Sequence, residues 1–355
     1  MAWVHAYGPS WVHETPYLPE GWEETSKTGA PTLKHAAMKQ TLSNQRNLTP
    51  GLFADVPWPI ASYLWDCLGR SRNRTLYMWK LFATAYPDAF ARVAQYRLMK
   101  IGSLKLSLRD YLGMVRSDSL NWRVVLTLAT SFAKVPELVE ISRVRNLVAL
   151  EISTPREVQS VVDGDSGDLE MSVTALSDRI FRTWSELAQG AGAFAHLRVL
   201  KLYYQEDLSK GVLQYLMEFP SLRFLIVYEC PGLSSIGMDE DLDGWEVTAE
   251  PVVSKEWPVM SLYSSYQASL VADIDGEPST INLICPILDF QIGPRTGPLP
   301  SREHDRAKTL CLRRRTEPRP ASKKLKTIQK PSGPRKRMMK DRRGKDIGES
   351  LREFL

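Results

Sequence analysis

The sequence predicts an α/β protein in which a short solenoid of strand–helix repeats follows a small helical module and precedes a disordered basic tail. Two stretches starting at Leu197 and Leu222 share one apolar spacing at an offset of 25 residues. Apolar residues recur at helical spacing between positions 59 and 115. Residues 301–355 hold 19 Lys and Arg against 7 Asp and Glu, whereas residues 1–300 hold 27 against 34. This asymmetry is typical of a tail that meets polyanions or a transport receptor.

The N-terminal third is expected to contain an arm and a helical module. Residues 1–45 are rich in Trp and Pro and show no sustained period, so we expect an extended arm. The helical module spans residues 46–118. Pro59 suits a first helical turn and Pro87 would end a helix. The expected helices cover residues 59–68, 76–86, 89–99 and 106–115.

Strand and helix patterns then alternate through a repeat domain at residues 119–292. Strands are expected at residues 121–128, 146–152, 197–202 and 222–227, and helices at residues 177–188 and 209–217 with Ser209 as N-cap. One repeat carries an acidic insertion at residues 163–170. The apolar runs between Asp239 and Phe290 are expected to cap the last repeat, because its apolar side would otherwise contact water.

Side chains between the core leucines of the two best repeats would face outward on the concave side of the sheet. They form a candidate surface for a protein partner, because repeat proteins of this kind usually bind through that face. These residues are Arg198, Val199, Lys201, Tyr203, Arg223, Phe224, Ile226 and Tyr228.

The repeat at Leu222, Leu225, Val227, Cys230 and Leu233 resembles the cysteine-containing subclass of leucine-rich repeats. Many members of that subclass are substrate receptors of Skp1–cullin–F-box ubiquitin ligases. Residues 56–82 resemble an F-box, with Val56-Pro57 where Leu-Pro is usual and a charged loop at residues 70–74. The whole arrangement resembles a group of leucine-rich-repeat proteins from filamentous fungi. The resemblance implies a Skp1-type adaptor as partner, contacted by Pro57, Ile60, Leu64, Leu68 and Trp79.

The basic tail, residues 293–345, carries two lysine and arginine clusters. Lys323, Lys324 and Lys326 fit a compact nuclear import signal, and Arg335, Lys336 and Arg337 extend it to the bipartite form. The same cations suit phosphates, so nonspecific nucleic-acid binding is the alternative to an import receptor.

Residues 346–355 form a short amphipathic motif, with Ile347, Leu351, Phe354 and Leu355 on one helical face. This face could dock on a partner, in a manner similar to sliding-clamp-binding peptides, or fold back on the body.

Other residue patterns argue against catalysis. The four cysteines lack metal or disulfide spacing, and the acidic insertion lacks the ligand order of a calcium loop. No nucleophile is paired with His5, His13, His35, His196 or His304, and no glycine-rich phosphate loop or membrane segment occurs. We therefore expect a non-catalytic, monomeric scaffold without cofactor or metal that acts in the nucleus or nucleocytoplasm. The alternative is a chromatin-associated or nucleic-acid-binding protein that acts through its tail.

Overall fold

The fold is built on one sheet with the strand order β1-β7-β2-β3-β4-β5-β8-β6. The computed structural model describes residues 33–71, 73–154, 174–234, 242, 244–248, 261–271, 285–293 and 309–315. The strands from β1 to β5 in this order are parallel, whereas β8 is antiparallel to both β5 and β6. The strands are β1 Tyr96–Ile101, β2 Arg123–Ala129, β3 Leu147–Ser153, β4 Val199–Tyr203, β5 Phe224–Tyr228, β6 Trp245–Thr248, β7 Ile287–Ile292 and β8 Thr309–Arg314.

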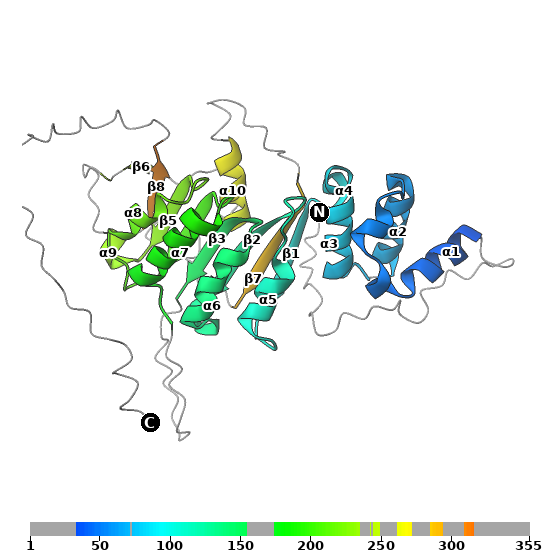
Figure 1. Ribbon diagram of the computed structural model, residues 1–355, viewed down its shortest axis with the longest axis horizontal. Coiled ribbons are helices and arrows are strands. Elements are labelled where there is room, and N and C mark those ends of the chain that lie inside the picture. Colours follow the sequence, from blue (N-terminus) through cyan, green and yellow to red (C-terminus); the bar gives the residue numbers. More distant parts are fainter. Residues whose placement is uncertain are drawn as a thin grey trace, which may run out of the picture. The chain divides into compact units, whose positions relative to one another are not determined.

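Helices precede the sheet and cover it. Figure 1 shows α5, α6, α7 and α8 following one another along one face, whereas α10 lies on the opposite face. The predicted mixed α/β class is therefore confirmed. The helices are α1 Leu33–Leu42, α2 Trp58–Arg70, α3 Leu76–Ala85, α4 Pro87–Ala94, α5 Leu108–Val115, α6 Val135–Glu140, α7 Asp178–Ala191, α8 Val212–Leu216, α9 Pro231–Ser234 and α10 Leu262–Val271.

Residues separated by 25 positions, the offset between the two best sequence repeats, lie opposite one another in β4 and β5. Leu200 of β4 lies opposite Leu225 of β5. The rings of Phe194 and Phe219, which are related by the same offset, stack with centroids separated by 4.7 Å. The residue after each strand, Tyr204 or Glu229, has a left-handed backbone with φ of 58° or 48°. Equivalent residues of the two units therefore pack against one another.

Buried polar side chains join the turns that follow the strands. Gln205 is fully buried, and its Nε2 donates to the carbonyl oxygen of Tyr203 at 2.8 Å. Its Oε1 accepts from Thr154 Oγ1 and from the backbone N–H of Leu176, both at 3.1 Å. Thr130 Oγ1 donates in turn to Thr154 Oγ1 at 3.0 Å. This chain of hydrogen bonds crosses the sheet from the end of β2 to the end of β4.

Cys230 occupies the same place one unit later. Its Sγ accepts from the backbone N–H of Gln205 at 3.3 Å and donates to the carbonyl oxygen of Tyr228 at 3.5 Å. Burial raises the pKa of the Cys230 thiol to about 11, so the thiol stays protonated at neutral pH. Cys230 thus extends the chain of hydrogen bonds between neighbouring turns to the turn that follows β5.

The predicted helical module contains a strand, β1, that was not expected. Helices α2, α3 and α5 match three expected helices, but the expected helix at 89–99 ends at Ala94, and β1 follows it. Helix α1 lies within the expected arm, whose residues 1–32 fall outside the described residues. The module packs against the start of β2, where the rings of Trp79 and of Trp122, the residue before the strand, meet edge to face with their centroids 5.8 Å apart.

Two segments of the C-terminal half differ from the prediction. Residues 287–292, expected in a cap after the last repeat, form β7 between β1 and β2. Residues 309–314, expected in the disordered tail, form β8 beside β5. Arg314 holds β8 in place, since its guanidinium donates to the carbonyl oxygens of Phe219 at 2.6 Å and Met217 at 2.9 Å. The edge of the sheet beyond β5 is therefore covered by β8 and β6.

Ser209 does not cap α8, because that helix begins at Val212 with Gly211 as its N-cap. Instead, the Ser209 backbone N–H and hydroxyl both donate to the carboxylate of Asp178 at the start of α7. This contact fixes the turn before α8 to the preceding helix.

Replacing Gln205 with Leu should test the hydrogen-bonded turns. The substitution removes the acceptor of the buried backbone N–H of Leu176 and of the Thr154 hydroxyl, so we expect the free energy of unfolding to fall by about 2–3 kcal/mol. Urea denaturation measures this loss. Gln214→Leu, at an exposed position of α8, is the matched control and should change stability by less than about 0.5 kcal/mol. Equal effects of the two substitutions would contradict a special role for Gln205.

Candidate functional site

The start of α2 carries the exposed part of the F-box-like contact. Pro57 and Ile60 are exposed, and the Ile60 side chain keeps 57% of its surface accessible. Leu64, Leu68 and Trp79 are buried in the core, with exposed fractions of 7%, 0% and 1%. Only two of the five predicted contact residues are therefore in a position to touch a partner.

Tyrosine hydroxyls hold the loop that leads into α2. Tyr86 donates to the carbonyl oxygens of Val56 at 2.5 Å and Phe53 at 3.0 Å. Tyr77 donates to the carbonyl oxygen of Leu48. The loop packs on an aromatic cluster of Phe53, Trp58, Trp65, Phe82, Tyr86 and Phe90. The loop and the start of α2 thus form a preorganised surface, on which Leu52 is 61% exposed.

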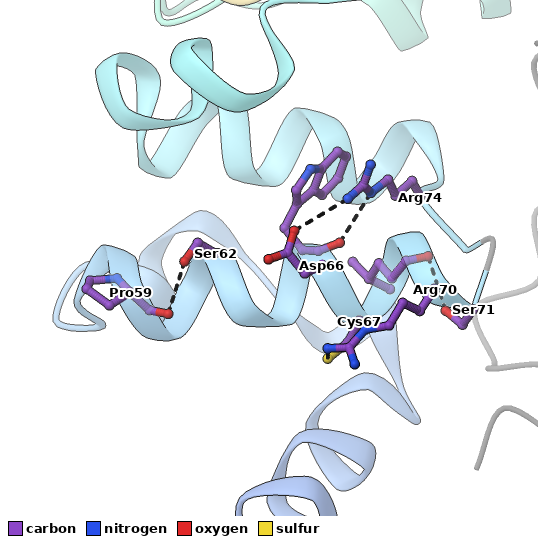
Figure 2. Close-up of polar contacts among 9 residues, drawn as sticks. Pro59, Ser62, Asp66, Cys67, Arg70, Ser71 and Arg74 are labelled. Carbon is purple, nitrogen blue, oxygen red and sulfur yellow. Dashed lines mark hydrogen bonds and ion pairs between the residues drawn. The ribbon is translucent and has the colours of Figure 1, made fainter. Parts of the chain in front are cut away.

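Arg74, in the loop after α2, contacts the C-terminal half of this helix (Figure 2). Its Nε donates to the carbonyl oxygen of Trp65 at 3.2 Å, and its guanidinium lies 4.7 Å from the centroid of the Trp65 ring. Its Nη2 also lies 3.6 Å from Asp66 Oδ1. A Cβ on Gly69 would lie 2.5 Å from Arg74 Nη2, so glycine is needed for this close approach. Partial burial lowers the pKa of Arg74, and Asp66 opposes that shift.

Arg70 also contacts its own helix. Its Nη2 lies 3.5 Å from Cys67 Sγ, and its guanidinium lies 5.8 Å from the ring centroid of Tyr63. Lys34 of α1 lies 3.7 Å from the same ring centroid. Burial raises the pKa of the Cys67 thiol, although Arg70 acts in the opposite direction. The charged loop seen in the sequence therefore contributes two arginines that stabilise α2.

The sheet brings the predicted partner-binding residues together but buries most of them. Lys201 lies opposite Ile226, and Tyr203 opposite Tyr228, in the register of β4 and β5. Lys201 is only 1% exposed. Arg198, Val199, Tyr203, Phe224, Ile226 and Tyr228 are also buried, whereas Arg223 is half-buried. These residues share one region of the sheet, but the expectation that they face solvent is wrong for all except Arg223.

Helix α10 covers part of this face. Arg198 donates from Nη2 to the carbonyl oxygen of Ser269 at 3.0 Å and from Nε to its Oγ at 3.3 Å. Arg123 donates to the hydroxyl of Tyr266 at 2.9 Å. Little in the sequence indicates α10, because its buried residues include Ser265 and Ser269 and make no apolar stripe.

The remaining candidates are dispersed. His196 precedes β4, and burial first, then the charge of Arg123, lowers its pKa. Within the described ranges, no group of three or more His, Cys, Asp and Glu side chains could hold a metal ion. In the same part of the chain, no helix combines the length and apolar character required to cross a membrane. The acidic insertion at 163–170, both tail clusters and the C-terminal motif at 346–355 lie outside the described residues.

Two substitutions should separate the contributions of Arg74. Arg74→Ala removes the hydrogen bond to the Trp65 carbonyl, the ring contact and the ion pair, so we expect a loss of about 1–2 kcal/mol in the free energy of unfolding. Asp66→Asn removes only the ion pair, whose carboxylate is 62% exposed, and should cost less than about 0.5 kcal/mol. Thermal and urea unfolding of both variants measure the difference. Equal losses would mean that the ion pair dominates.

Comparison with known proteins identifies no relative of this chain. The chain matches no protein-family model, no curated protein and no solved structure. The contacts and exposures described above are therefore the basis for a functional proposal.

Proposed function

We propose that this protein is a non-catalytic interaction scaffold, in which an F-box-like helical module docks a Skp1-type adaptor and a leucine-rich-repeat sheet carries the surface for a second protein. The proposal includes action in the nucleus, which rests on the basic clusters of the tail sequence.

The leucine-rich-repeat assignment is supported by the equivalence of residues related by the repeat offset. Core leucines recur at this offset in β4 and β5, and stacked phenylalanines before the strands and left-handed and buried turn residues after them recur at the same offset. In repeat proteins each unit buries its apolar side against the next, which requires such equivalence. The insertion of β7 and the antiparallel β8 are departures from a simple repeat array.

The docking function is carried by one observation, the exposure of Ile60 at the rigid start of α2. The apolar residues that follow in this helix, Leu64 and Leu68, are buried in the core, whereas Ile60 remains 57% exposed near exposed Pro57. Leu52 of the same preorganised surface is 61% exposed. Apolar side chains held on a rigid surface are suited to bury against a partner.

A pull-down with purified Skp1 tests the docking function. Ile60→Glu should reduce binding at least about tenfold, because a carboxylate would be buried against the adaptor without a partner. The melting temperature should stay within about 2 °C, since Ile60 makes little contact with the core.

Val93→Glu on α4 is the matched control, because Val93 is 54% exposed in the same module. It should leave Skp1 binding unchanged. Failure of the folded, unmodified chain to bind Skp1 would remove the adaptor part of the proposal and leave the repeat scaffold.

A second function, nonspecific nucleic-acid binding, is favoured by the charge of the tail. Residues 316–345 hold 12 Lys and Arg against 2 Asp and Glu. Cations at this density bind phosphate backbones with an affinity that falls steeply as salt increases.

Deletion of residues 316–345 should abolish nucleic-acid binding, measured by fluorescence anisotropy between about 50 and 200 mM salt. The deletion must begin after Arg315, because a cut at 301 would also remove β8 from the sheet. Unchanged binding after this deletion would rule out the tail as the binding element. The same variant fused to a fluorescent protein reports whether nuclear entry depends on the tail.

A further inference from the structure

Helix α10 and the sheet face that it covers form a small core of their own. Its buried members on the sheet include Val125, Ala149, Val199, Phe224 and Ile226, and α10 adds Leu262 and Tyr266. The large core on the other face contains none of these residues. It runs from the helical module through Leu126, Leu150, Leu200 and Leu225 to Leu312. Loss of the α10 contacts would therefore leave the large core complete.

The α10 side of the interface is chemically mixed. Two of its fully buried residues are Ser265 and Ser269, and Ala268 is 6% exposed. Small and hydroxylated side chains bury less apolar area than leucines would, so the interface contributes less stabilisation per helical turn. A free helix of 10 residues is also marginal in water, so α10 would unfold when it leaves the sheet.

Charged groups lie on the same sheet face. Glu151 and Lys201 are neighbours in the register of β3 and β4. Their exposed fractions are 2% and 1%. Burial of charged groups carries a large desolvation cost, which is recovered when the face meets water. A sheet face that carries buried charges therefore holds its cover less tightly than an all-apolar face would.

We propose that α10 is a displaceable cover, which opens separately from the rest of the fold and exposes the sheet face formed by β2, β3 and β4. In the closed state α10 blocks residues assigned above to partner binding. The use of this face by a partner rests on the proposed scaffold function, but the opening is a property of the isolated chain. The two hydrogen bonds from Arg198 to Ser269 hold the closed state.

Native-state hydrogen exchange on the full chain tests the cover. The α10 amides should exchange at least about tenfold faster than those of Leu150, Leu200 and Leu202, because local opening requires less free energy than global unfolding. Arg198→Ala should accelerate exchange in α10 by about tenfold or more through loss of the charged hydrogen bonds. It should change exchange in β3 by less than about twofold.

Arg109→Ala is the control, because Arg109 is 65% exposed and pairs with Glu140 rather than with α10. It should leave α10 exchange unchanged. Exchange of α10 at the rate of the β3 and β4 amides in the unmodified chain would overturn the proposal, whether or not the Arg198 variant folds. The measurement needs no partner, so a failed Skp1 pull-down would count against the docking function alone.

Discussion

The fold depends on the requirement that the buried turns after its central strands satisfy their backbone hydrogen bonds. Gln205 meets this requirement at the turn after β4, where it binds Thr154, Leu176 and the Tyr203 carbonyl. Cys230 meets it one unit later. Because each side chain bonds to the neighbouring turn, the strands stay in register and the helices that follow them lie side by side. The regular offset between the sequence repeats reflects this requirement, because it places Gln205 and Cys230 in equivalent turns.

Local patterns predicted the elements whose partners are near in sequence, and failed where partners are distant. Strands β3, β4 and β5 were predicted because their leucine spacing is visible within one repeat. Most of β1 was predicted as helix, since nothing near it indicates that its partner β7 lies in the C-terminal part of the chain. The start of α2 was predicted, but periodicity could not show that Ile60 is exposed while Leu64 is buried. Burial beneath α10 was missed because a serine-containing helix has no apolar period to reveal it.

Charge in this chain has two different roles. Arg74 stabilises the end of α2, Arg314 holds β8, and Arg198 binds α10. Arginine suits these positions because one guanidinium can donate several hydrogen bonds at once. Basic residues in the sequence therefore indicate a polyanion or receptor only after those with structural contacts are set aside. The densest run of Lys and Arg in the sequence lies after Arg315, where the proposed import and nucleic-acid functions lie.

The position of β7 has a consequence for how the chain folds. In a simple repeat array each unit contacts only its neighbours, so folding can begin at one end and spread. Here β1 and β2 are separated by a strand that leaves the ribosome long after both of them. The N-terminal part of the sheet is therefore completed only when the C-terminal part has been synthesised, and this long-range pairing raises the contact order and slows folding. The same pairing couples distant parts of the chain, so beyond the edge strand β1 the sheet cannot open from its N-terminal side without displacing the C-terminal strand β7.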